Sequence, residues 1–313
     1  MSRVLVTGGA GFLGSWICDA LVEQGKKVIC VDNLSSGLIS NIAHLVKNDN
    51  FQFIQHDIST PIFFDNKIDL ILHLASRASP LEFKEFPIQT LKTNTIGTWK
   101  ALGIAKKHNA RVLFTSSSEV YGKATIIPTP EDYNGNVNCI GARSSYDEGK
   151  RAGEAMCMAY LRRHDIDVRI ARVFNTYGER MRADGFYGRV VPRFVEQALN
   201  NKPITVFGNG SQTRSFCYVT DTVAGLLKLA YSEEAKGEVV NIGNDTELTI
   251  LELANIVKEL TKSESEIAFE ELPEDDPTRR RPDITKARKL LGWQPKVYLE
   301  EGLKLFIKER RKK

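Results

Sequence analysis

The chain has 313 residues, of which 42% are hydrophobic and 26% are charged, a composition typical of globular proteins with one large core or two smaller ones. Lys and Arg outnumber Asp and Glu by only 43 to 39, so we expect no nucleic-acid partner. Apolar runs are too short to span a bilayer, the N-terminus runs directly into a strand-like segment, and the five cysteines are scattered, which predicts a cytoplasmic protein with no membrane anchor and no metal site.

Short apolar runs follow one another along the first half of the chain and predict strands at residues 3–7, 27–31, 51–54, 68–73, 111–115 and 167–171. Helical patterns at residues 12–24, 89–108 and 146–163 lie between most of these runs. Strands that are apolar throughout are typical of a parallel sheet covered by helices on both faces. The sequence therefore predicts an α/β fold with a doubly wound parallel sheet, whose ligands bind at the carboxyl ends of the strands.

The pattern becomes shorter and more mixed after residue 174. We expect helices at residues 190–200, 221–231 and 250–260 and strands at 204–207 and 239–242, followed by a basic loop and two short helices. This pattern predicts a smaller C-terminal lobe, mainly residues 174–313, that closes over the ligand edge of a first domain formed by residues 1–173. We expect the chain to cross between the two parts more than once.

The segment between the first strand and the first helix carries the glycine spacing of a dinucleotide site. Gly8, Gly11 and Gly14 allow a tight turn, close approach of the backbone to a pyrophosphate, and close packing of helix on strand. The open helix N-terminus favours the phosphates. Asp32 ends the second strand, where a carboxylate accepts hydrogen bonds from ribose hydroxyls and repels a 2′-phosphate. The pattern thus predicts a Rossmann domain that binds NAD rather than NADP.

Two polar residues at other strand ends can each be interpreted in two ways. Asp57 closes the third strand and can accept a hydrogen bond from an adenine amino group or cap a local turn. His73 ends the fourth strand, and we expect it to be a structural histidine rather than a catalyst.

A candidate catalytic group stands at the end of the fifth strand and at the start of the next helix. Tyr146 and Lys150 are four residues apart on one helix face, so the ammonium lies beside the phenol. A cation there lowers the pKa of the phenol, which makes Tyr146 a usable base near neutral pH. Ser117 can hold the substrate hydroxyl that Tyr146 deprotonates, while hydride passes to the nicotinamide.

These motifs together resemble the extended short-chain dehydrogenases that act on nucleotide sugars, and most closely the UDP-glucuronate decarboxylases. The resemblance covers nearly the whole chain and rests on TGGAGFLGS, HLASRASP, SSSEVYG, YDEGKR, GSQTRSF and LGWQP. It implies NAD-dependent decarboxylation of UDP-glucuronate to UDP-xylose through a 4-keto intermediate, with NAD regenerated in place. Members of this family commonly form homodimers through helices equivalent to residues 89–108 and 146–163.

The resemblance also assigns site residues. It places Glu119 and Arg214 near the sugar carboxylate as catalytic residues beside Ser117, Tyr146 and Lys150, and it places Arg143 near the cofactor. The expected cofactor-binding residues are Gly8, Gly11, Phe12, Leu13, Asp32, Asn33, Asp57, Ile58, Leu74, Thr93, Tyr146, Lys150 and Arg172. The expected substrate-binding residues are Ser79, Lys92, Asn94, Ser118, Asn175, Arg189, Val190, Tyr218 and Arg281, with Arg279 and Asp283 as further matches to the UDP site.

The sequence departs from the family pattern at two of these positions, and three rival functions remain open. Arg77 stands where the family usually has proline, and Ser117 replaces a commoner threonine. A nucleotide-sugar 4-epimerase shares the Tyr, Lys and NAD logic and is the main rival. A dTDP-glucose 4,6-dehydratase needs an Asp-Glu pair where this chain has Ser118 and Glu119. A non-catalytic NAD-binding sensor is disfavoured because Tyr146 and Lys150 are both present.

Overall fold

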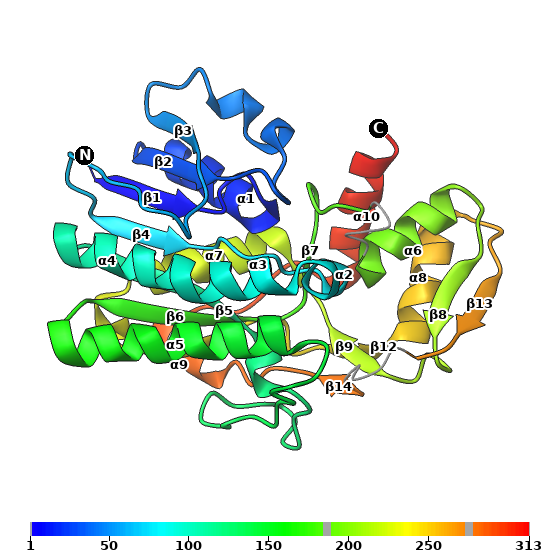
Figure 1. Ribbon diagram of the computed structural model, residues 1–313. Helices are drawn as coiled ribbons and strands as arrows, with labels where there is room; N and C mark the ends of the chain where they lie inside the picture. The colour runs from blue at the N-terminus through cyan, green and yellow to red at the C-terminus, as the bar shows by residue number, and fades with distance from the viewer. Residues whose placement is uncertain (1, 184–188, 273–277, 313) are drawn as a thin grey trace.

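The computed structural model describes residues 2–183, 189–272 and 278–312. Within them, seven parallel strands form one sheet in the order β11, β6, β5, β4, β1, β2 and β3 (Figure 1). The strands are β1 (Arg3–Thr7), β2 (Lys27–Asp32), β3 (Phe51–Gln55), β4 (Leu70–His73), β5 (Arg111–Ser117), β6 (Val168–Val173) and β11 (Val239–Ile242). The expected α/β fold with a doubly wound parallel sheet is confirmed.

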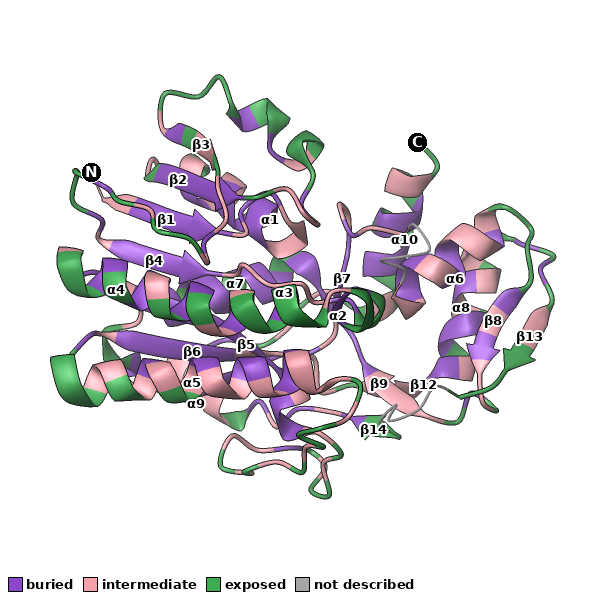
Figure 2. Ribbon diagram, in the orientation of Figure 1, coloured by how far each residue is buried: buried purple, intermediate pink, exposed green. Residues whose placement is uncertain are grey.

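Helices cover both faces of this sheet. One face carries a long helical segment before β5 and another before β6; the opposite face carries one helix after β1 and a second that packs on β5, β6 and β11. These are α3 (Pro87–Lys92), α4 (Thr98–His108) and α5 (Ser144–His164) on the first face, and α1 (Phe12–Glu23) and α7 (Val219–Tyr231) on the second. Apolar residues that alternate along the strands enter two separate cores. Most strands are therefore buried along much of their length (Figure 2), which explains their apolar runs.

The last strand of the sheet, β11, lies beyond residue 173, where the sequence predicts that the first domain ends. β11 pairs with β6, and α7 packs against α1, although both elements follow residue 174. α9 (Thr285–Leu291) also returns to contact α7 and β11. The chain therefore crosses between the two parts more than once. The assignment of 1–173 to the cofactor and 174–313 mainly to the substrate stays a prediction.

The smaller lobe combines helices with short two- and three-stranded sheets. Its helices are α6 (Val190–Leu199), α8 (Ile250–Thr261) and α10 (Leu299–Arg310). Its strands are β7 (Thr176–Tyr177), β8 (Ile204–Phe207), β9 (Thr213–Ser215), β10 (Cys217–Tyr218), β12 (Glu247–Thr249), β13 (Ile267–Glu270) and β14 (Arg279–Arg280). Thr249 and Glu252 form a capping box that fixes the start of α8. In the described part of the chain, no helix is both long and apolar enough to cross a membrane.

The helix expected at residues 89–108 differs from the prediction. It starts at Pro87 and contains a π-helical turn, η3 (Thr93–Gly97), between α3 and α4. Such turns are rare and are frequent at functional sites. A short helix that the sequence analysis did not predict, α2 (Pro80–Glu85), precedes it. The remaining short helical turns are η1 (Ile39–Asn41), η2 (Ala43–Leu45), η4 (Ser118–Tyr121) and η5 (Glu233–Ala235).

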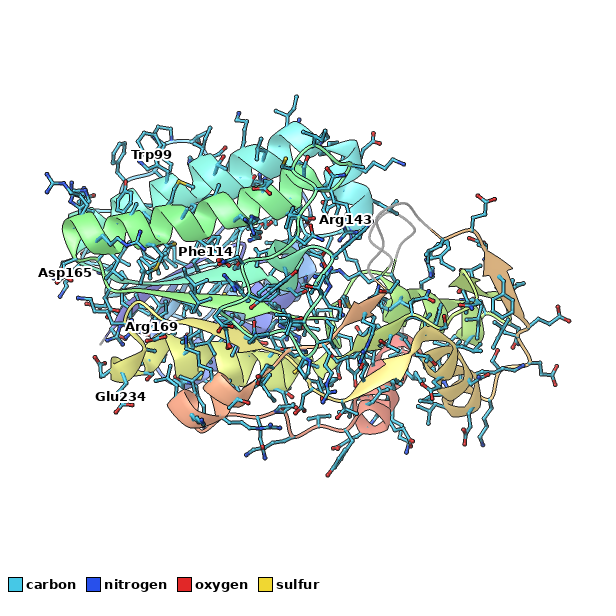
Figure 3. All side chains as sticks on the ribbon, turned by 90° about the horizontal axis from the view of Figure 1, so that it is seen from below. Trp99, Phe114, Arg143, Asp165, Arg169 and Glu234 are labelled. Carbon is cyan, nitrogen blue, oxygen red and sulfur yellow. The ribbon has the colours of Figure 1, made fainter. Side chains whose placement is uncertain are left out.

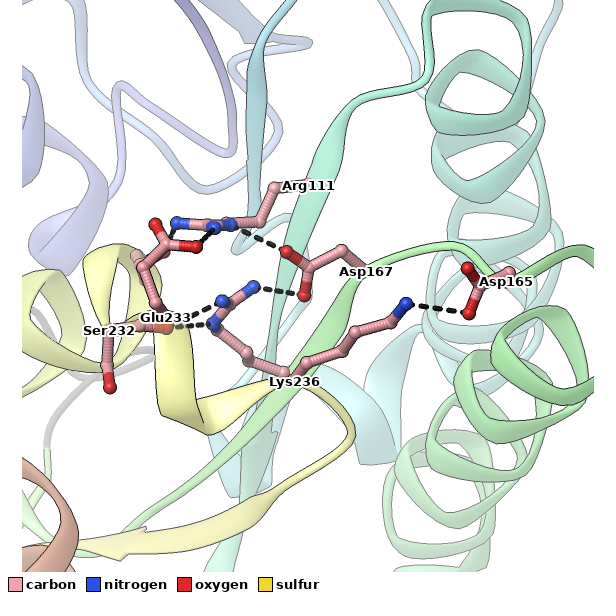
Figure 4. A network of polar contacts seen from close by, with 8 residues as sticks. Arg111, Asp165, Asp167, Ser232, Glu233 and Lys236 are labelled. Atoms are coloured by element: carbon pink, nitrogen blue, oxygen red, sulfur yellow. Dashed lines mark hydrogen bonds and ion pairs between the residues drawn. The ribbon is translucent and has the colours of Figure 1, made fainter.

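A polar network lies at the amino ends of β5 and β6 (Figure 4). Arg111 at the start of β5 donates to Asp167 and Glu233 at 2.8 and 2.7 Å. Arg169, which is fully buried, pairs with Asp167 and donates twice to the carbonyl oxygen of Ser232, at 3.2 and 2.6 Å. The network ties the end of α7 to the starts of β5 and β6.

Candidate active site

A cavity of about 760 Å³ lies at the carboxyl edge of the sheet and is lined by residues of both parts of the chain. The glycine turn after β1, the ends of β2, β4 and β5, and the start of α5 contribute from the first part. Residues Arg189 and Val190 at the start of α6, Arg214 of β9 and Arg280 of β14 contribute from the second. Ligands of doubly wound sheets bind at this edge because the strand ends and helix N-termini converge there.

The glycine turn fits a dinucleotide phosphate. Gly8 has a φ of 72°, and a Cβ on it would lie 2.8 Å from the backbone of Ala75. A Cβ on Gly14 would lie 2.1 Å from the carbonyl oxygen of Gly8, so close packing of α1 on the turn requires glycine. Gly11 is the N-cap of α1 and carries no side-chain cap. Gly11, Phe12 and Leu13 line the cavity, so the N-terminus of α1 borders it, as an anion site requires.

Asp32 stands at the end of β2 beside this turn. Its carboxylate accepts hydrogen bonds from the N–H groups of Ala10 and Leu34 at 3.0 and 2.8 Å and is 8% exposed. Burial raises the pKa of Asp32, while the backbone hydrogen bonds lower it in part. The side chain lines the cavity at the position from which it can accept ribose hydroxyls.

The other expected cofactor residues mostly line the same part of the cavity, namely Phe12, Leu13, Asn33, Asp57, Ile58, Leu74 and Thr93. Burial of Asp57 would raise its pKa, but hydrogen bonds from Ser59 and from Asn33 lower it below its ordinary value. His73 is buried and contacts the hydroxyls of Thr7 and Thr98 at 2.7 and 3.2 Å. Burial lowers its pKa to about 3, in keeping with the structural interpretation.

Tyr146, Lys150 and Ser117 meet at the centre of the cavity. The Tyr146 hydroxyl lies beside the side chain of Ser117, whose hydroxyl lowers the pKa of the phenol. The Lys150 ammonium lies 5.9 Å from the centre of the Tyr146 ring and donates to the carbonyl oxygen of Thr115 at 2.8 Å. The geometry brings a phenol, a hydroxyl and an amine together at the end of β5 and the start of α5.

The pKa of Tyr146 corrects the sequence analysis. We expected Lys150 to lower it, but burial raises it, and the hydroxyl of Ser117 and the charge of Arg189 offset that effect in part. Phe83 of α2 stacks on the Tyr146 ring with centroids 5.1 Å apart, which contributes to this burial. Burial also lowers the pKa of Lys150 to about 7, so its charge is weaker than expected near neutral pH.

Glu119 of η4 lies at the centre of an arginine cluster on the other side of Ser117. It accepts hydrogen bonds from Arg143 at 2.5 Å and from Arg280 at 3.1 Å. Burial alone would raise the pKa of Glu119, but the charges of Arg280, Arg143 and Arg214 lower it to about 2. Figure 3 shows Arg143 at the cavity end of α5. The cluster presents positive charge to the cavity, as binding of an anionic group requires.

Several residues expected to bind substrate line the cavity, namely Ser79, Ser118, Asn175, Arg189 and Val190. The guanidinium of Arg189 donates to the carbonyl oxygen of Ala78 and so links the start of α6 to the loop after β4. The side-chain nitrogen of Asn175 is buried and has no hydrogen-bond partner among the residues that the structure describes. It is a donor available to a ligand oxygen.

Other expected site residues lie outside the cavity lining, and their contacts explain why. Arg172 pairs with Glu154 at 2.8 Å and donates to Tyr121 at 2.9 Å, which makes it an internal cross-link. The Tyr218 hydroxyl donates to Glu179 at 2.6 Å.

Three more expected substrate residues lie outside the lining as well. Asn94 is fully buried in the π-helical turn, where it accepts from Ser76 at 2.8 Å. Lys92 is exposed on α3. Arg281 follows the end of β14, and its neighbour Arg280 enters the cavity instead.

The sequence did not predict that Arg280 lines the cavity or that Arg143 pairs with Glu119. Arg280 is 4% exposed and donates to the carbonyl oxygen of Ser118 and to Glu119. Arg279 instead pairs with Glu247 at 2.6 Å on the outer side. Neighbouring strand residues point to opposite sides. β14 therefore turns Arg280 inward and Arg279 outward, and this alternation was the available signal.

The chain is similar in sequence to a known protein family and to its members. The sequence pattern of the NAD dependent epimerase/dehydratase family matches residues 4–243. UDP-glucuronic acid decarboxylase 4 of Arabidopsis thaliana is 50% identical over 311 residues, which cover 99% of this chain and 69% of that protein.

Two solved structures superimpose on nearly the whole chain. UDP-glucose 4-epimerase of Thermotoga maritima, with UDP-glucose, has a TM-score of 0.90 at 33% identity and 99% coverage of both chains. UDP-glucuronic acid 4-epimerase of Bacillus cereus, in complex with UDP-glucuronic acid and NAD, has a TM-score of 0.89 at 28% identity and 99% coverage of both. The cavity residues from Gly8 to Arg214 lie inside the range matched by the family pattern, and Arg280 lies beyond it.

Proposed function

This chain belongs to the NAD-dependent epimerase/dehydratase family, and from that premise we propose that it decarboxylates UDP-glucuronate to UDP-xylose. It is an NAD-dependent carboxy-lyase of the extended short-chain dehydrogenase/reductase type. The arginine cluster around Glu119, beside Tyr146, is the observation that carries the proposal, because a carboxylate on the substrate needs cationic groups at the reacting end of the sugar.

The glycine turn, the N-terminus of α1 and Asp32 hold NAD. When bound, NAD supplies a hydride acceptor for the sugar's 4-position and returns the hydride at the end of the reaction. Gly8 and Gly11 permit the backbone to approach the pyrophosphate, and Asp32 accepts the ribose hydroxyls. Asn175, Arg189 and Val190 are the residues that we assign to the nucleotide diphosphate of the substrate.

Tyr146 and Ser117 control the proton of the 4-hydroxyl. Both side chains line the cavity, where their hydroxyls can share that proton, and Tyr146 removes it during oxidation and returns it during reduction. Because burial raises the pKa of Tyr146, the phenolate depends on nearby positive charge, which Arg189 supplies in part. Lys150 fixes the site through its hydrogen bond to Thr115.

The arginine cluster acts on the carboxylate. Oxidation at the 4-position produces a β-keto acid, which loses carbon dioxide because the resulting carbanion is an enolate. Arg143, Arg214 and Arg280 orient the carboxylate before it leaves. Glu119 is ionised near neutral pH because its pKa is about 2. We therefore assign it to holding these arginines and a water that protonates the enolate, rather than to donating its own proton.

The decisive experiment is product analysis with UDP-glucuronate labelled with ¹³C at the carboxylate. We expect labelled carbon dioxide and UDP-xylose by mass spectrometry, with catalytic rather than stoichiometric NAD. UDP-galacturonate that retains the label would instead show the rival 4-epimerase, the activity named for the superimposed Bacillus cereus protein. No conversion of UDP-glucuronate by NAD-loaded protein would contradict both assignments.

We further propose that the chain works as a homodimer in the cytoplasm. Four apolar side chains are exposed along α3, η3 and α4, namely Ile88, Leu91, Ile96 and Trp99, and a second copy of these helices and α5 would cover them. Analytical ultracentrifugation tests the dimer: Trp99→Glu should shift the protein to monomer, whereas Tyr298→Glu, an exposed residue before α10, should not. Scattered cysteines without a CxxC pair support a reducing compartment.

A further inference from the structure

Asp147 is a buried carboxyl group that the proposed mechanism does not use. It lies in the first turn of α5, directly after Tyr146, and is 6% exposed. One carboxylate oxygen lies 3.9 Å from the Nε atom of Arg143. The other oxygen is buried and, within residues 2–183, 189–272 and 278–312, has no hydrogen-bond partner. Buried polar groups are nearly always satisfied, so an orphaned oxygen at an active site calls for an explanation.

The charged groups that face Asp147 come from three elements. Glu119 belongs to η4, Arg280 to β14, and Arg143 and Glu148 flank Asp147 at the start of α5. Burial raises the pKa of Asp147 most, Glu119 and Glu148 raise it further, and Arg143 and Arg280 lower it. The resulting value is about 7.

Asp147 is also coupled to the catalytic phenol. A negative charge on Asp147 or on Glu119 raises the pKa of Tyr146, whereas the charge of Arg189 lowers it. Protonation of Asp147 therefore favours the phenolate that abstracts the sugar proton. Interacting groups of this kind titrate together, so any anion that enters the cluster changes the proton occupancy of Asp147.

We propose that Asp147 is a positioning residue that balances the charge of the arginine cluster. Its carboxyl, which lies beside Arg143 with one oxygen unpartnered, takes up a proton from solvent when the substrate carboxylate enters and releases it after that carboxylate leaves as carbon dioxide. This inference rests on the proposed function. The neutral carboxyl leaves Arg143 and Arg280 to the substrate and to Glu119, and it removes a negative charge from the neighbourhood of Tyr146 during the oxidation step.

Linkage between substrate binding and proton binding sets the sign and size of the proton uptake. An added negative charge raises the pKa of a neighbouring carboxyl, so the complex binds more protons than the free protein. At pH 7, a carboxyl whose pKa is about 7 is half protonated. Asp147 can therefore contribute uptake of at most about half a proton at this pH. By reciprocity, lower pH must tighten binding of a carboxylate-bearing sugar more than of a neutral one.

The test is titration calorimetry at pH 7 in buffers of different ionisation enthalpy. The protein is the NAD-loaded full chain with Tyr146→Phe, which prevents turnover. We expect uptake of about half a proton with UDP-glucuronate and close to none with UDP-xylose, which lacks the carboxylate. Adding Asp147→Asn should abolish the uptake. Adding Asp165→Asn, a control at the opposite end of α5 whose carboxylate pairs with Lys236, should leave it in place.

Each outcome decides a different claim. Binding of UDP-glucuronate with the same proton uptake in the Asp147→Asn protein overturns the inference and leaves the proposed function standing. Absence of binding overturns both. If Asp147→Asn fails to fold, Asp147→Glu serves in its place: a retained carboxyl must keep the uptake but with a shifted pH dependence, and an unchanged dependence overturns the inference.

Discussion

Two arginine networks of similar composition lie at opposite ends of β5 and β6, and they do different work. At the amino end, Arg111 and Arg169 donate to Asp167, Glu233 and main-chain oxygens. At the carboxyl end, Arg143, Arg214 and Arg280 surround Glu119 and line the cavity. Figure 3 shows the separation, with Arg169 and Asp165 toward one end of α5 and Arg143 at the other.

The difference lies in what the arginines face. In the amino-end network the arginines donate to acceptors of the protein itself, and Arg169 is fully buried. The carboxyl-end cluster has one strongly acidic carboxylate, and its arginines border a cavity. Buried ion pairs add little net stability but are costly to break. Residue type alone therefore does not separate a structural network from a binding site; the position relative to the strand ends does.

The largest expected effect is on turnover at the carboxyl end. Tyr146→Phe removes the hydroxyl that shares a proton with Ser117 and should lower kcat by about 10²-fold to 10⁴-fold with NAD still bound. Steady-state kinetics and retention of bound nucleotide measure the two parts. Tyr160→Phe, on the same helix and packed on His164, should leave kcat unchanged. Full turnover by the Tyr146 variant would refute the base assignment.

The amino end should show the opposite response. Arg169→Met removes the buried guanidinium that pairs with Asp167 and donates to the carbonyl oxygen of Ser232, whereas Arg111 still pairs with Asp167. The substitution should lower the free energy of unfolding by about 1–3 kcal/mol, while kcat of the folded fraction stays unchanged. Urea unfolding followed by kinetics measures both. Arg143→Met is the reverse control, with lost turnover and a smaller loss of stability. If both variants lose stability equally and keep activity, the contrast between the two networks is wrong.

A pH dependence follows from Lys150. Burial lowers its pKa to about 7, below the unfolded value of about 10.4. The stability that favours the neutral amine is therefore complete above the unfolded pKa and is lost as pH falls through the folded one. Lys150→Met should gain stability relative to the parent as pH drops from 9 to 6. Paired thermal unfolding curves in the absence of nucleotide test this, and a difference independent of pH would contradict it.

The smallest effect is expected at Arg279. Its side chain is 52% exposed and pairs with Glu247 on the outer side of β14. An exposed ion pair contributes about 1 kcal/mol or less, so Arg279→Ala should change neither kcat nor unfolding appreciably. Arg280→Ala, one residue along, should reduce turnover because Arg280 contacts Glu119. Equal effects of the two substitutions would show that alternation along β14 does not select the active arginine.

Much of the fold could be predicted because burial on both faces makes each strand of the sheet a continuous apolar run. The runs at residues 3–7 and 27–31 correspond closely to β1 and β2. The π-helical turn could not be predicted in this way. It seats Asn94 against Gly149 of α5, where an added Cβ would lie 2.9 Å from the Asn94 Cβ. That contact joins residues 55 positions apart and leaves no mark in local periodicity.

The candidate site shows the same limit. Local spacing brought together Gly8, Gly11, Asp32, Tyr146 and Lys150, because a turn and one helix face position them. The pKa direction of Tyr146 could not be obtained from spacing, since it depends on burial that α2 helps to provide through Phe83. Which of Arg280 and Arg281 lines the cavity depends on how β14 pairs with β9, a long-range contact.

The late position of β11 has a consequence for synthesis on the ribosome. β6 cannot pair with β11 until residues 239–242 have emerged from the ribosome. α7, which covers one face of β5 and β6, ends only at Tyr231. Until then a nascent chain exposes an unpaired strand edge and an uncovered apolar face, both of which promote aggregation. A fragment that stops at residue 173 should therefore precipitate or bind chaperones, and folding of the nucleotide domain must wait for most of the translation.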